Sequence, residues 1–211
     1  MINKNKIKSI VLILARQNSQ RLKNKNIKKL NNDPLILWTI NFAKKIKKNN
    51  EILVSTDSPK IIEISNKAGV LAPWKRPSYL SGSKITSYKS AKHAIEWYQK
   101  KISKIDTIIL LQPTSPYRRL STFKKMYNLF KKKNLKSIAS FSDKPNSLNY
   151  RFKKIVPNGN IYINKIDNLY KYKDFINFET TQFILKNNKE NIDIDTKKDW
   201  ILAQKNLRKK K

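Results

Sequence analysis

Residues 10–30 read IVLILARQNSQRLKNKNIKKL, and this stretch decides the class of fold. It opens with five consecutive apolar residues, 10–14, a pattern typical of a strand that is buried on both faces. The chain then turns polar and carries arginines, lysines and amides, among them Arg16, Asn18 and Lys25. In an open α/β sheet, ligands bind at the carboxyl ends of the strands, where cationic side chains and backbone amides can neutralise phosphate. The stretch therefore predicts a nucleotide-binding strand and loop.

The rest of the chain alternates apolar strands with amphipathic helices. Further strands are predicted at 51–55, 106–111, 137–141 and 161–163. Helices are predicted at 35–47, 59–68, 87–101, 121–133 and 196–207. Asp33-Pro34 and Ser58-Pro59 each place a capping residue before a first-turn proline, which is a helix start signal. Repeated strand–helix units predict a three-layer, Rossmann-like α/β fold with a mostly parallel sheet, and 142–157 is predicted as a loop or hairpin.

Composition narrows the class of protein. The chain has 47 lysines and arginines against 14 acidic residues, a net charge of +33, which suits a basic nucleic-acid-binding protein. The lysines are spread along the whole chain beside abundant asparagine and isoleucine, residues with A/T-rich codons, so no specific nucleic-acid partner is expected. The absence of cysteine excludes disulfides and thiolate metal sites. No apolar run reaches the roughly 18 residues that span a membrane, so we expect a cytoplasmic protein without membrane contact.

Polar segments that can carry chemistry follow the predicted strands. Gln112 begins the turn after strand 106–111, and Asp193 and Asp195 precede the last helix. Two carboxylates at positions i and i+2 of an extended backbone point the same way, and with phosphate oxygens they can hold Mg²⁺. Plainer interpretations stay open, because Asp195 could merely cap the last helix and Gln112 could sit in a rigid turn. Three glycines in all leave neither a GxGxxG nor a GxxxxGK[ST] motif.

Taken in order, these segments resemble the CMP-N-acylneuraminate (sialic acid) synthetases, cytidylyltransferases that activate nine-carbon acidic sugars. LQPTSP followed by NGxIYI and DIDT is quite specific to this family. The matching segments are LARQNSQRLKNKNI (14–27), WTINFA (38–43), ILVSTD (52–57), KRPSYL (75–80), HAIE (93–96), LLQPTSPYR (110–118), PNGNIYIN (157–164) and IDIDTKKDW (192–200).

The resemblance implies transfer of CMP from CTP to the anomeric hydroxyl of a nonulosonic acid, with release of pyrophosphate. It implies nucleotide-binding roles for Arg16, Asn18, Ser19, Lys25, Asn26 and Arg76. It implies acceptor-binding roles for Ser87, Gln112, Asn158 and Gly159. It implies that Asp193 and Asp195 carry Mg²⁺, and that Arg16, Lys25 and Asp195 act in catalysis. It also implies a single nucleotidyltransferase domain over 1–211, with a small, shortened excursion around 142–180 that serves a homodimer.

Departures from the family pattern fall mainly on the acceptor side. Family members commonly have lysine where Gln20 stands and aspartate where Ser83 stands. They also carry a longer, arginine-bearing segment where this chain has only 146–156. The departures leave two alternatives open, a different nonulosonic acid such as legionaminate as the acceptor, or a catalytically weakened relative.

Overall fold

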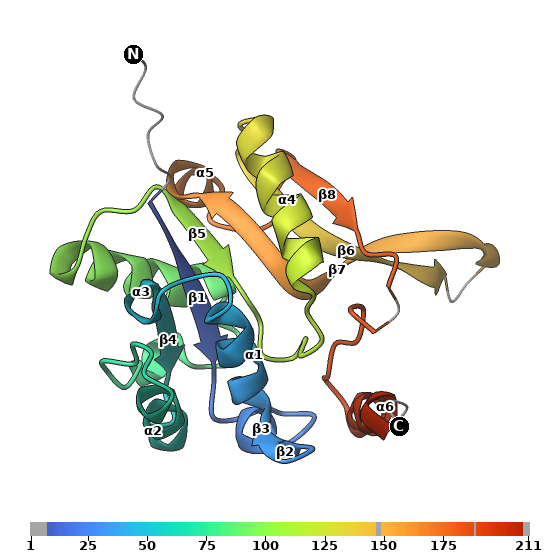
Figure 1. Ribbon diagram of the computed structural model, residues 1–211, viewed down its shortest axis with the longest axis horizontal. Helices are drawn as coiled ribbons and strands as arrows, with labels where there is room; N and C mark the ends of the chain where they lie inside the picture. Colours follow the sequence, from blue (N-terminus) through green and yellow to red (C-terminus); the bar gives the residue numbers. More distant parts are fainter. Residues whose placement is uncertain (1–7, 147–148, 188, 209–211) are drawn as a thin grey trace.

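The computed structural model describes residues 8–146, 149–187 and 189–208. Its centre is a six-stranded sheet in the order β4-β1-β5-β7-β6-β8, with helices on both faces (Figure 1). The strands are β1 (Ser9–Ala15), β4 (Ile52–Thr56), β5 (Thr107–Leu110), β6 (Ser137–Asn146), β7 (Asn149–Lys165) and β8 (Thr180–Ile184), with a separate pair β2 (Lys29–Leu30) and β3 (Asp33–Pro34). The helices are α1 (Leu35–Ala43), α2 (Pro59–Lys67), α3 (Ser87–Lys101), α4 (Leu120–Lys132), α5 (Ile166–Tyr172) and α6 (Lys197–Arg208), with short 3-10 turns at Lys25–Ile27, Asn49–Glu51 and Ser78–Leu80.

The predicted three-layer α/β fold with a mostly parallel sheet is confirmed. β1 runs parallel to β4 and β5, and β6 runs parallel to β8. The exception is β7, which is antiparallel to both of its neighbours, β5 and β6. The parallel trio β4-β1-β5 therefore brings the carboxyl ends of three strands to one edge, which is where such sheets bind ligands.

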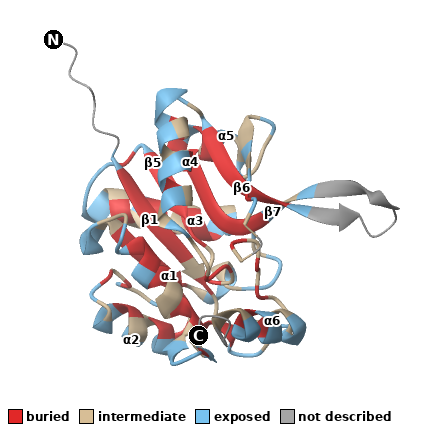
Figure 2. Ribbon diagram, turned by 45° about the vertical axis from the view of Figure 1, so that its right-hand side comes forward, coloured by how far each residue is buried: buried red, intermediate tan, exposed pale blue. Residues whose placement is uncertain are grey.

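Strand β1 is buried on both faces, as its unbroken apolar run predicts (Figure 2). Val11 and Ile13 face a cluster built by α1, α2 and α4, whereas Ile10 and Leu12 face a second cluster built by α3 and α5. This alternation follows from the period of two in a strand. Packing on both faces fixes the direction in which β1 delivers the loop that begins at Arg16.

Of the two predicted helix starts, the one at Ser58-Pro59 agrees with the structure and the one at Asp33-Pro34 does not. Ser58 does precede α2 with Pro59 in its first turn. Asp33 does not cap α1, because it pairs with Leu30 in the β2–β3 hairpin and Pro34 takes the position before the helix. Helix α1 also ends at Ala43, earlier than the predicted 47.

The stretch 142–157, predicted as a loop or hairpin, is a hairpin in which β6 and β7 run on beyond the body of the sheet (Figure 1). The side chains of 144–154 lie outside what the structure describes. Helix α5 and strand β8 were not predicted from the sequence. Strand β8 is the edge strand beside β6, whereas α5 follows the end of β7 that lies opposite the hairpin, next to the start of β5. A role of the excursion around 142–180 in dimerisation stays a prediction.

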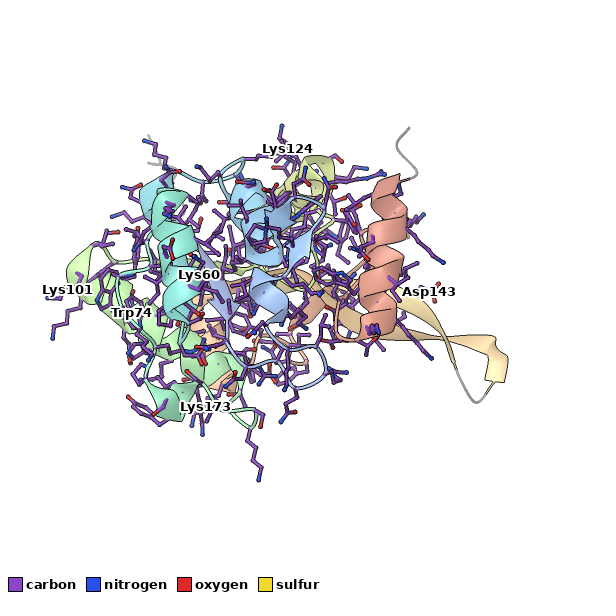
Figure 3. The ribbon with its side chains drawn as sticks, turned by 90° about the horizontal axis from the view of Figure 1, so that it is seen from below. Lys60, Trp74, Lys101, Lys124, Asp143 and Lys173 are labelled. Carbon is purple, nitrogen blue, oxygen red and sulfur yellow. The ribbon has the colours of Figure 1, made fainter. Side chains whose placement is uncertain are left out.

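The positive charge is distributed over several elements. Figure 3 labels lysines on different elements and at well-separated places, namely Lys60 on α2, Lys101 on α3, Lys124 on α4 and Lys173 just after α5. A nucleic-acid-binding face would gather such charge on one side. Within the described residues, none of the helices is both long enough and apolar enough to cross a bilayer.

Candidate active site

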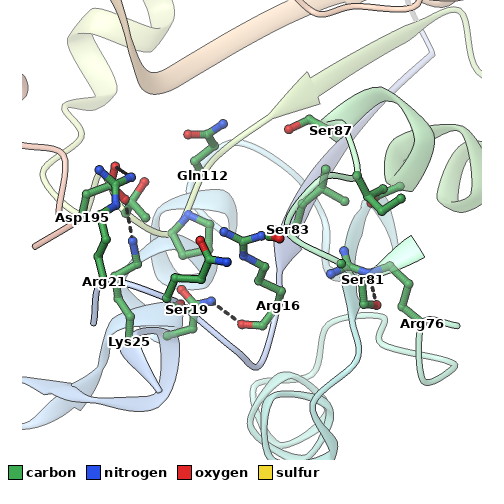
Figure 4. A pocket seen from close by; sticks show the side chains of 18 of the residues that line it. Arg16, Ser19, Arg21, Lys25, Arg76, Ser81, Ser83, Ser87, Gln112 and Asp195 are labelled. Atoms are coloured by element: carbon green, nitrogen blue, oxygen red, sulfur yellow. Dashed lines mark hydrogen bonds and ion pairs between the residues drawn. The ribbon is translucent and has the colours of Figure 1, made fainter. Parts of the chain in front are cut away.

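A polar cavity of about 350 Å³ opens beyond the carboxyl ends of β1 and β5 (Figure 4). Its walls come from the loop after β1, the stretch before α3, the turn after β5 and the segment before α6. It is lined by nine of the residues singled out from the sequence, Arg16, Ser19, Lys25, Asn26, Arg76, Ser87, Gln112, Asp193 and Asp195. Residues from opposite ends of the sequence thus meet in one cavity of a size that suits a small-molecule ligand.

Three predicted site residues do not line the cavity. Asn18 is exposed on the loop after β1. The Asn158 side chain is buried behind the cavity, where its Oδ1 accepts from Ser140 Oγ at 2.7 Å and its Nδ2 donates to Asn191 Oδ1 at 3.0 Å. These two side chains therefore do not line the cavity, and the binding roles that the resemblance implies for Asn18 and Asn158 stay predictions.

Gly159, the third of them, acts from behind Gln112. Its φ is +72°, and a Cβ at this position would lie 2.5 Å from Gln112 Oε1. The missing side chain thus leaves the space that the Gln112 amide occupies on the cavity wall. Gly159 thus permits a close approach of the Gln112 side chain, and its acceptor-binding role stays a prediction.

We expect Gly159→Ala to weaken binding of the ligand at Gln112. The new methyl group must displace the Gln112 amide, and a left-handed backbone costs a non-glycine residue about 1–2 kcal/mol. Isothermal titration calorimetry measures the ligand affinity of the variant, and thermal denaturation measures its stability. Gly82→Ala is the control for stability, since its Cβ would meet only Ile85 at an ordinary 3.7 Å. An unchanged ligand affinity in Gly159→Ala would contradict the role of Gly159.

The loop after β1 is held by two hydrogen bonds, one within the loop and one to Asp57, which follows β4. Asn26 Nδ2 donates to the carbonyl of Arg16 at 3.0 Å, and the Gln17 amide donates to Asp57 Oδ1 at 2.8 Å. Asn26 Oδ1 is buried and has no partner within the described part of the chain. A buried acceptor without a partner is costly, so this oxygen suits an amino or hydroxyl donor of a bound ligand.

Arg76 and Arg16 bring two positive charges to the cavity. Arg76 is buried and donates to the Ser55 carbonyl at 3.2 Å and to Ser81 Oγ at 3.1 Å. Burial lowers the pKa of Arg76, the charge of Asp57 raises it, and the charge of Arg16 lowers it again. Two guanidinium groups that repel each other beside a cavity are stabilised by an anion placed between them.

Asp195 is bound by two cations from the loop after β1. Lys25 Nζ donates to Asp195 Oδ1 at 2.8 Å, and Arg21 Nη2 donates to Asp195 Oδ2 at 2.6 Å. Burial acts to raise the pKa of Asp195, but the hydrogen bonds and charges of Lys25 and Arg21 together outweigh it and lower that pKa. Asp195 is therefore a carboxylate at neutral pH, with its charge directed toward the cavity.

The interpretation of Asp195 as a helix cap is wrong. The residue that caps α6 is Thr196, whose Oγ1 accepts from the Asp199 amide at 3.3 Å. Asp199 Oδ2 in turn accepts from the Thr196 amide at 2.7 Å, which completes a reciprocal capping arrangement. Thr196 and Asp199 accept hydrogen bonds from backbone amides at the start of α6, so the Asp195 carboxylate is not needed there and lines the cavity.

The segment that carries Asp193 and Asp195 is anchored at the residue between them. Ile194 is fully buried, and its amide donates to the Thr114 carbonyl at 2.7 Å. Its carbonyl accepts from Lys25 Nζ at 2.6 Å. The alternation of an extended backbone then turns the carboxylates on either side of Ile194 to the cavity, as predicted from their i, i+2 spacing.

Several lining residues were not among the candidate site residues, notably Arg21, Ser81 and Thr114. Arg21 lies in the cationic loop, and Thr114 lies in the turn after Gln112, both of which the sequence singled out as segments that can carry chemistry. Ser81 could not be found from the sequence, because it lies in an irregular stretch and reaches the cavity through its bond to Arg76. The remaining lining residues are Leu14, Gln20, Leu80, Gly82, Ser83, Ile85, Ser90, Leu110 and Pro113.

Comparison with solved structures supports the same fold. The chain superimposes on CMP:2-keto-3-deoxy-manno-octonic acid synthetase complexed with CTP with a TM-score of 0.71, at 15% identity, over 97% of this chain and 100% of that one. A cytidylyltransferase from Leptospira borgpetersenii gives a TM-score of 0.66 at 18% identity, over 97% of this chain and 95% of that one.

Sequence comparison is more specific. The chain is 30% identical to the CMP-N,N'-diacetyllegionaminic acid synthase of Legionella pneumophila, over 93% of this chain and 94% of that protein. It is 28% identical to the N-acylneuraminate cytidylyltransferase of Escherichia coli, over 93% of this chain but only 51% of that longer protein. A family model described as cytidylyltransferase matches residues 10–208. With the cationic cavity at the end of β1, these matches establish that the chain belongs to the cytidylyltransferase family.

Proposed function

We propose that this protein transfers CMP from CTP to the anomeric hydroxyl of a nonulosonic acid and releases pyrophosphate. The observation that carries the proposal is a single cavity that combines Arg16, Lys25 and Arg76 with the carboxylates of Asp193 and Asp195. A bond forms between the anomeric oxygen and the α-phosphorus, and the bond from that phosphorus to the bridging oxygen of pyrophosphate breaks. Such a reaction needs positioning and charge neutralisation more than covalent help from the protein.

The cations on one side of the cavity receive the triphosphate. Arg16 and Arg76 face the cavity from the end of β1 and from the stretch before α3, and Arg21 stands exposed at its mouth. A triphosphate brings about four negative charges, and one pair of opposite charges at 4 Å is worth about 4 kcal/mol at an intermediate dielectric. Lys25 is buried and already bound to Asp195, so it neutralises charge from a fixed position. Catalysis by Arg16, Lys25 and Asp195 is part of this proposal.

Neutral donors on the other side of the cavity receive the acceptor sugar. Ser87 lies at the start of α3, and Gln112 lies at the end of β5 (Figure 4). Gln112 offers both a donor and an acceptor, and the Ser87 hydroxyl can do the same, which matches the hydroxyls of a sugar. They would hold the acceptor so that its anomeric oxygen faces the α-phosphorus.

Mg²⁺ is the metal that the site would take. Two carboxylates on one wall, with phosphate oxygens from the ligand, match the few protein ligands that this ion prefers. Asp193 and Asp195 would hold it, once the exposed Arg21 side chain moves from Asp195 Oδ2 to a phosphate. Bound there, Mg²⁺ would polarise the α-phosphate and offset the charge of the leaving pyrophosphate.

We further propose that the protein works as a homodimer in the cytoplasm. Support for the dimer comes from the β6–β7 hairpin that projects from the sheet and from Ile184 of β8, which is 42% exposed. Support for the location comes from the consumption of CTP, an intracellular nucleotide. The mass of the protein in solution tests the dimer.

The experiment that tests the function measures pyrophosphate release from CTP with a panel of nonulosonic acids that includes N-acetylneuraminate and legionaminate. We expect turnover with CTP and Mg²⁺ and at least one acid of the panel. ATP and GTP should give no turnover, because the cavity must match one base. Equal release with all three nucleotides in the presence of the same acid would refute the proposal.

A further inference from the structure

Arg118, which does not line the cavity, connects three elements beneath it. It lies in the turn after β5, and all of its guanidinium nitrogens donate hydrogen bonds. Nη2 donates to the carbonyl of Gln112 at 2.5 Å, Nε to the carbonyl of Asn160 at 2.7 Å and Nη1 to Thr39 Oγ1 at 3.0 Å. The acceptors belong to the turn itself, to β7 and to α1. One planar group therefore fixes where these elements meet.

Arg118 is half-buried, and its guanidinium lies against interior groups. Thr39 is fully buried, and the ring of Phe42 lies 5.9 Å from the guanidinium carbon. Burial lowers the pKa of Arg118, and the negative charge of Asp193 acts in the opposite direction. A guanidinium stays protonated under such conditions, so a positive charge is held near Asp193 from within the protein.

A polar layer, buried except for the half-buried Asn191, lies around this charge. We use that name for Ser115, Ser140, Asn158, Asn160, Tyr162, Glu190 and Asn191. Ser115 Oγ donates to the Asn158 carbonyl at 3.0 Å, and Asn160 Nδ2 donates to the Glu190 carbonyl at 2.8 Å. The layer thus runs from the turn after β5 to the segment that leads to Asp193, and a network of this kind holds its members in one arrangement.

We propose that Arg118 is a positioning residue that fixes Gln112 and Asp193 relative to each other, and thereby the acceptor side of the cavity relative to its metal side. The proposal rests on the proposed function for the roles of these two residues. The planar guanidinium suits this task, because its donors point in fixed and different directions in one plane. A lysine would keep the charge near Asp193 but could not bond all three acceptors in that geometry.

The test compares Arg118→Met, Arg118→Lys and the control Arg119→Met. Arg119 is the next residue, its side chain is 57% exposed, and its Nε lies 3.9 Å from Glu190 Oε2 of the polar layer. For Arg118→Met we expect kcat/KM for the acceptor to fall about 100-fold, as for a displacement of roughly 1 Å at a reacting group. Affinity for CTP, measured by calorimetry without acceptor and without Mg²⁺, should not change, because Arg16, Lys25 and Arg76 lie elsewhere. Arg118→Lys should fall between Arg118→Met and the wild type, and Arg119→Met should match the wild type.

A merely structural role would lower the melting temperature and leave the kinetic constants of the folded protein unchanged, and that result would overturn the proposal. If Arg118→Met fails to fold, Arg118→Lys decides the question. A lowered kcat/KM for the acceptor with an unchanged affinity for CTP supports the proposal, and unchanged values of both overturn it. A crystal structure of the folded variant adds a readout that needs no turnover. A displaced Gln112 supports the proposal, and an unmoved Gln112 overturns it. If the wild type releases no pyrophosphate with any acid, the proposed function fails, and the crystal structures still decide the role of Arg118.

Discussion

Replacing Asp195 by asparagine is expected to lower the rate of pyrophosphate release at least about 100-fold, as the loss of a group that stabilises transition-state charge does. The chain should stay folded, because the end of α6 is capped by Thr196 and Asp199. The asparagine side chain would keep a neutral oxygen for Lys25 and Arg21 but would lose the charge that attracts a metal ion. Steady-state kinetics over a range of Mg²⁺ concentrations, with thermal denaturation in parallel, measure both effects.

Asp199→Asn provides the matched control, four residues away. It weakens the capping arrangement, which costs about 1 kcal/mol of stability. The Asp195 amide donates to Asp199 Oδ2 at 3.1 Å, and the amide oxygen of asparagine can still accept this bond. The kinetic constants of Asp199→Asn should therefore equal those of the wild type, and the two variants are expected to show opposite phenotypes. A fully active Asp195→Asn protein would remove Asp195 from the metal site.

Replacing Lys25 by methionine should have the second largest effect. The change removes the bonds of Nζ to the Ile194 carbonyl and to Asp195, and leaves both acceptors without this donor. We expect a loss of about 2 kcal/mol of stability, reduced from the value for a fully buried pair because Asp195 is partly exposed, and a 10- to 100-fold loss of CTP affinity, about the value of one hydrogen bond to a charged group.

The pH dependence of stability provides a second measurement on the same variant. The pKa of Asp195 is lowered in the folded protein, so its pairing stabilises the fold above the ordinary carboxyl pKa and is lost as the pH falls through the lowered value. In Lys25→Met the pKa of Asp195 should rise, so this contribution at neutral pH should shrink and less stability should be lost as the pH falls below the ordinary carboxyl pKa of about 4. Lys23→Met, on an exposed residue of the same loop, is the control. An unchanged acid limb in Lys25→Met would show that the pair contributes nothing.

The sequence was most informative where one short segment carries both structure and chemistry. The apolar run of β1 and the cationic loop after it are adjacent, so Arg16 and Lys25 could be placed at a strand end from local pattern alone. The i, i+2 spacing of Asp193 and Asp195 also predicted correctly that both face one side. Such inferences succeed because they depend on the period of the backbone and on nothing distant.

Features that depend on distant contacts could not be predicted. Asp195 stayed a candidate for the cap of α6, because the side chains of Thr196 and Asp199 can only be ranked against it in three dimensions. Gly159 lies behind Gln112 through the antiparallel pairing of β5 with β7, which the pattern of parallel units did not suggest. Arg118 has partners 42 and 79 residues away, and no spacing in the sequence indicates them.

The contact between Lys25 and Asp195 also bears on the order of events during synthesis. These residues are 170 positions apart. At ribosomal speeds of about 5–20 residues per second, roughly 10–30 s separate their appearance. A nascent chain therefore exposes a cationic loop well before the carboxylates that balance its charge exist. In that interval the loop can attract nucleotides or RNA but cannot assemble the complete site, so the enzyme becomes competent only after residue 195 has left the ribosome.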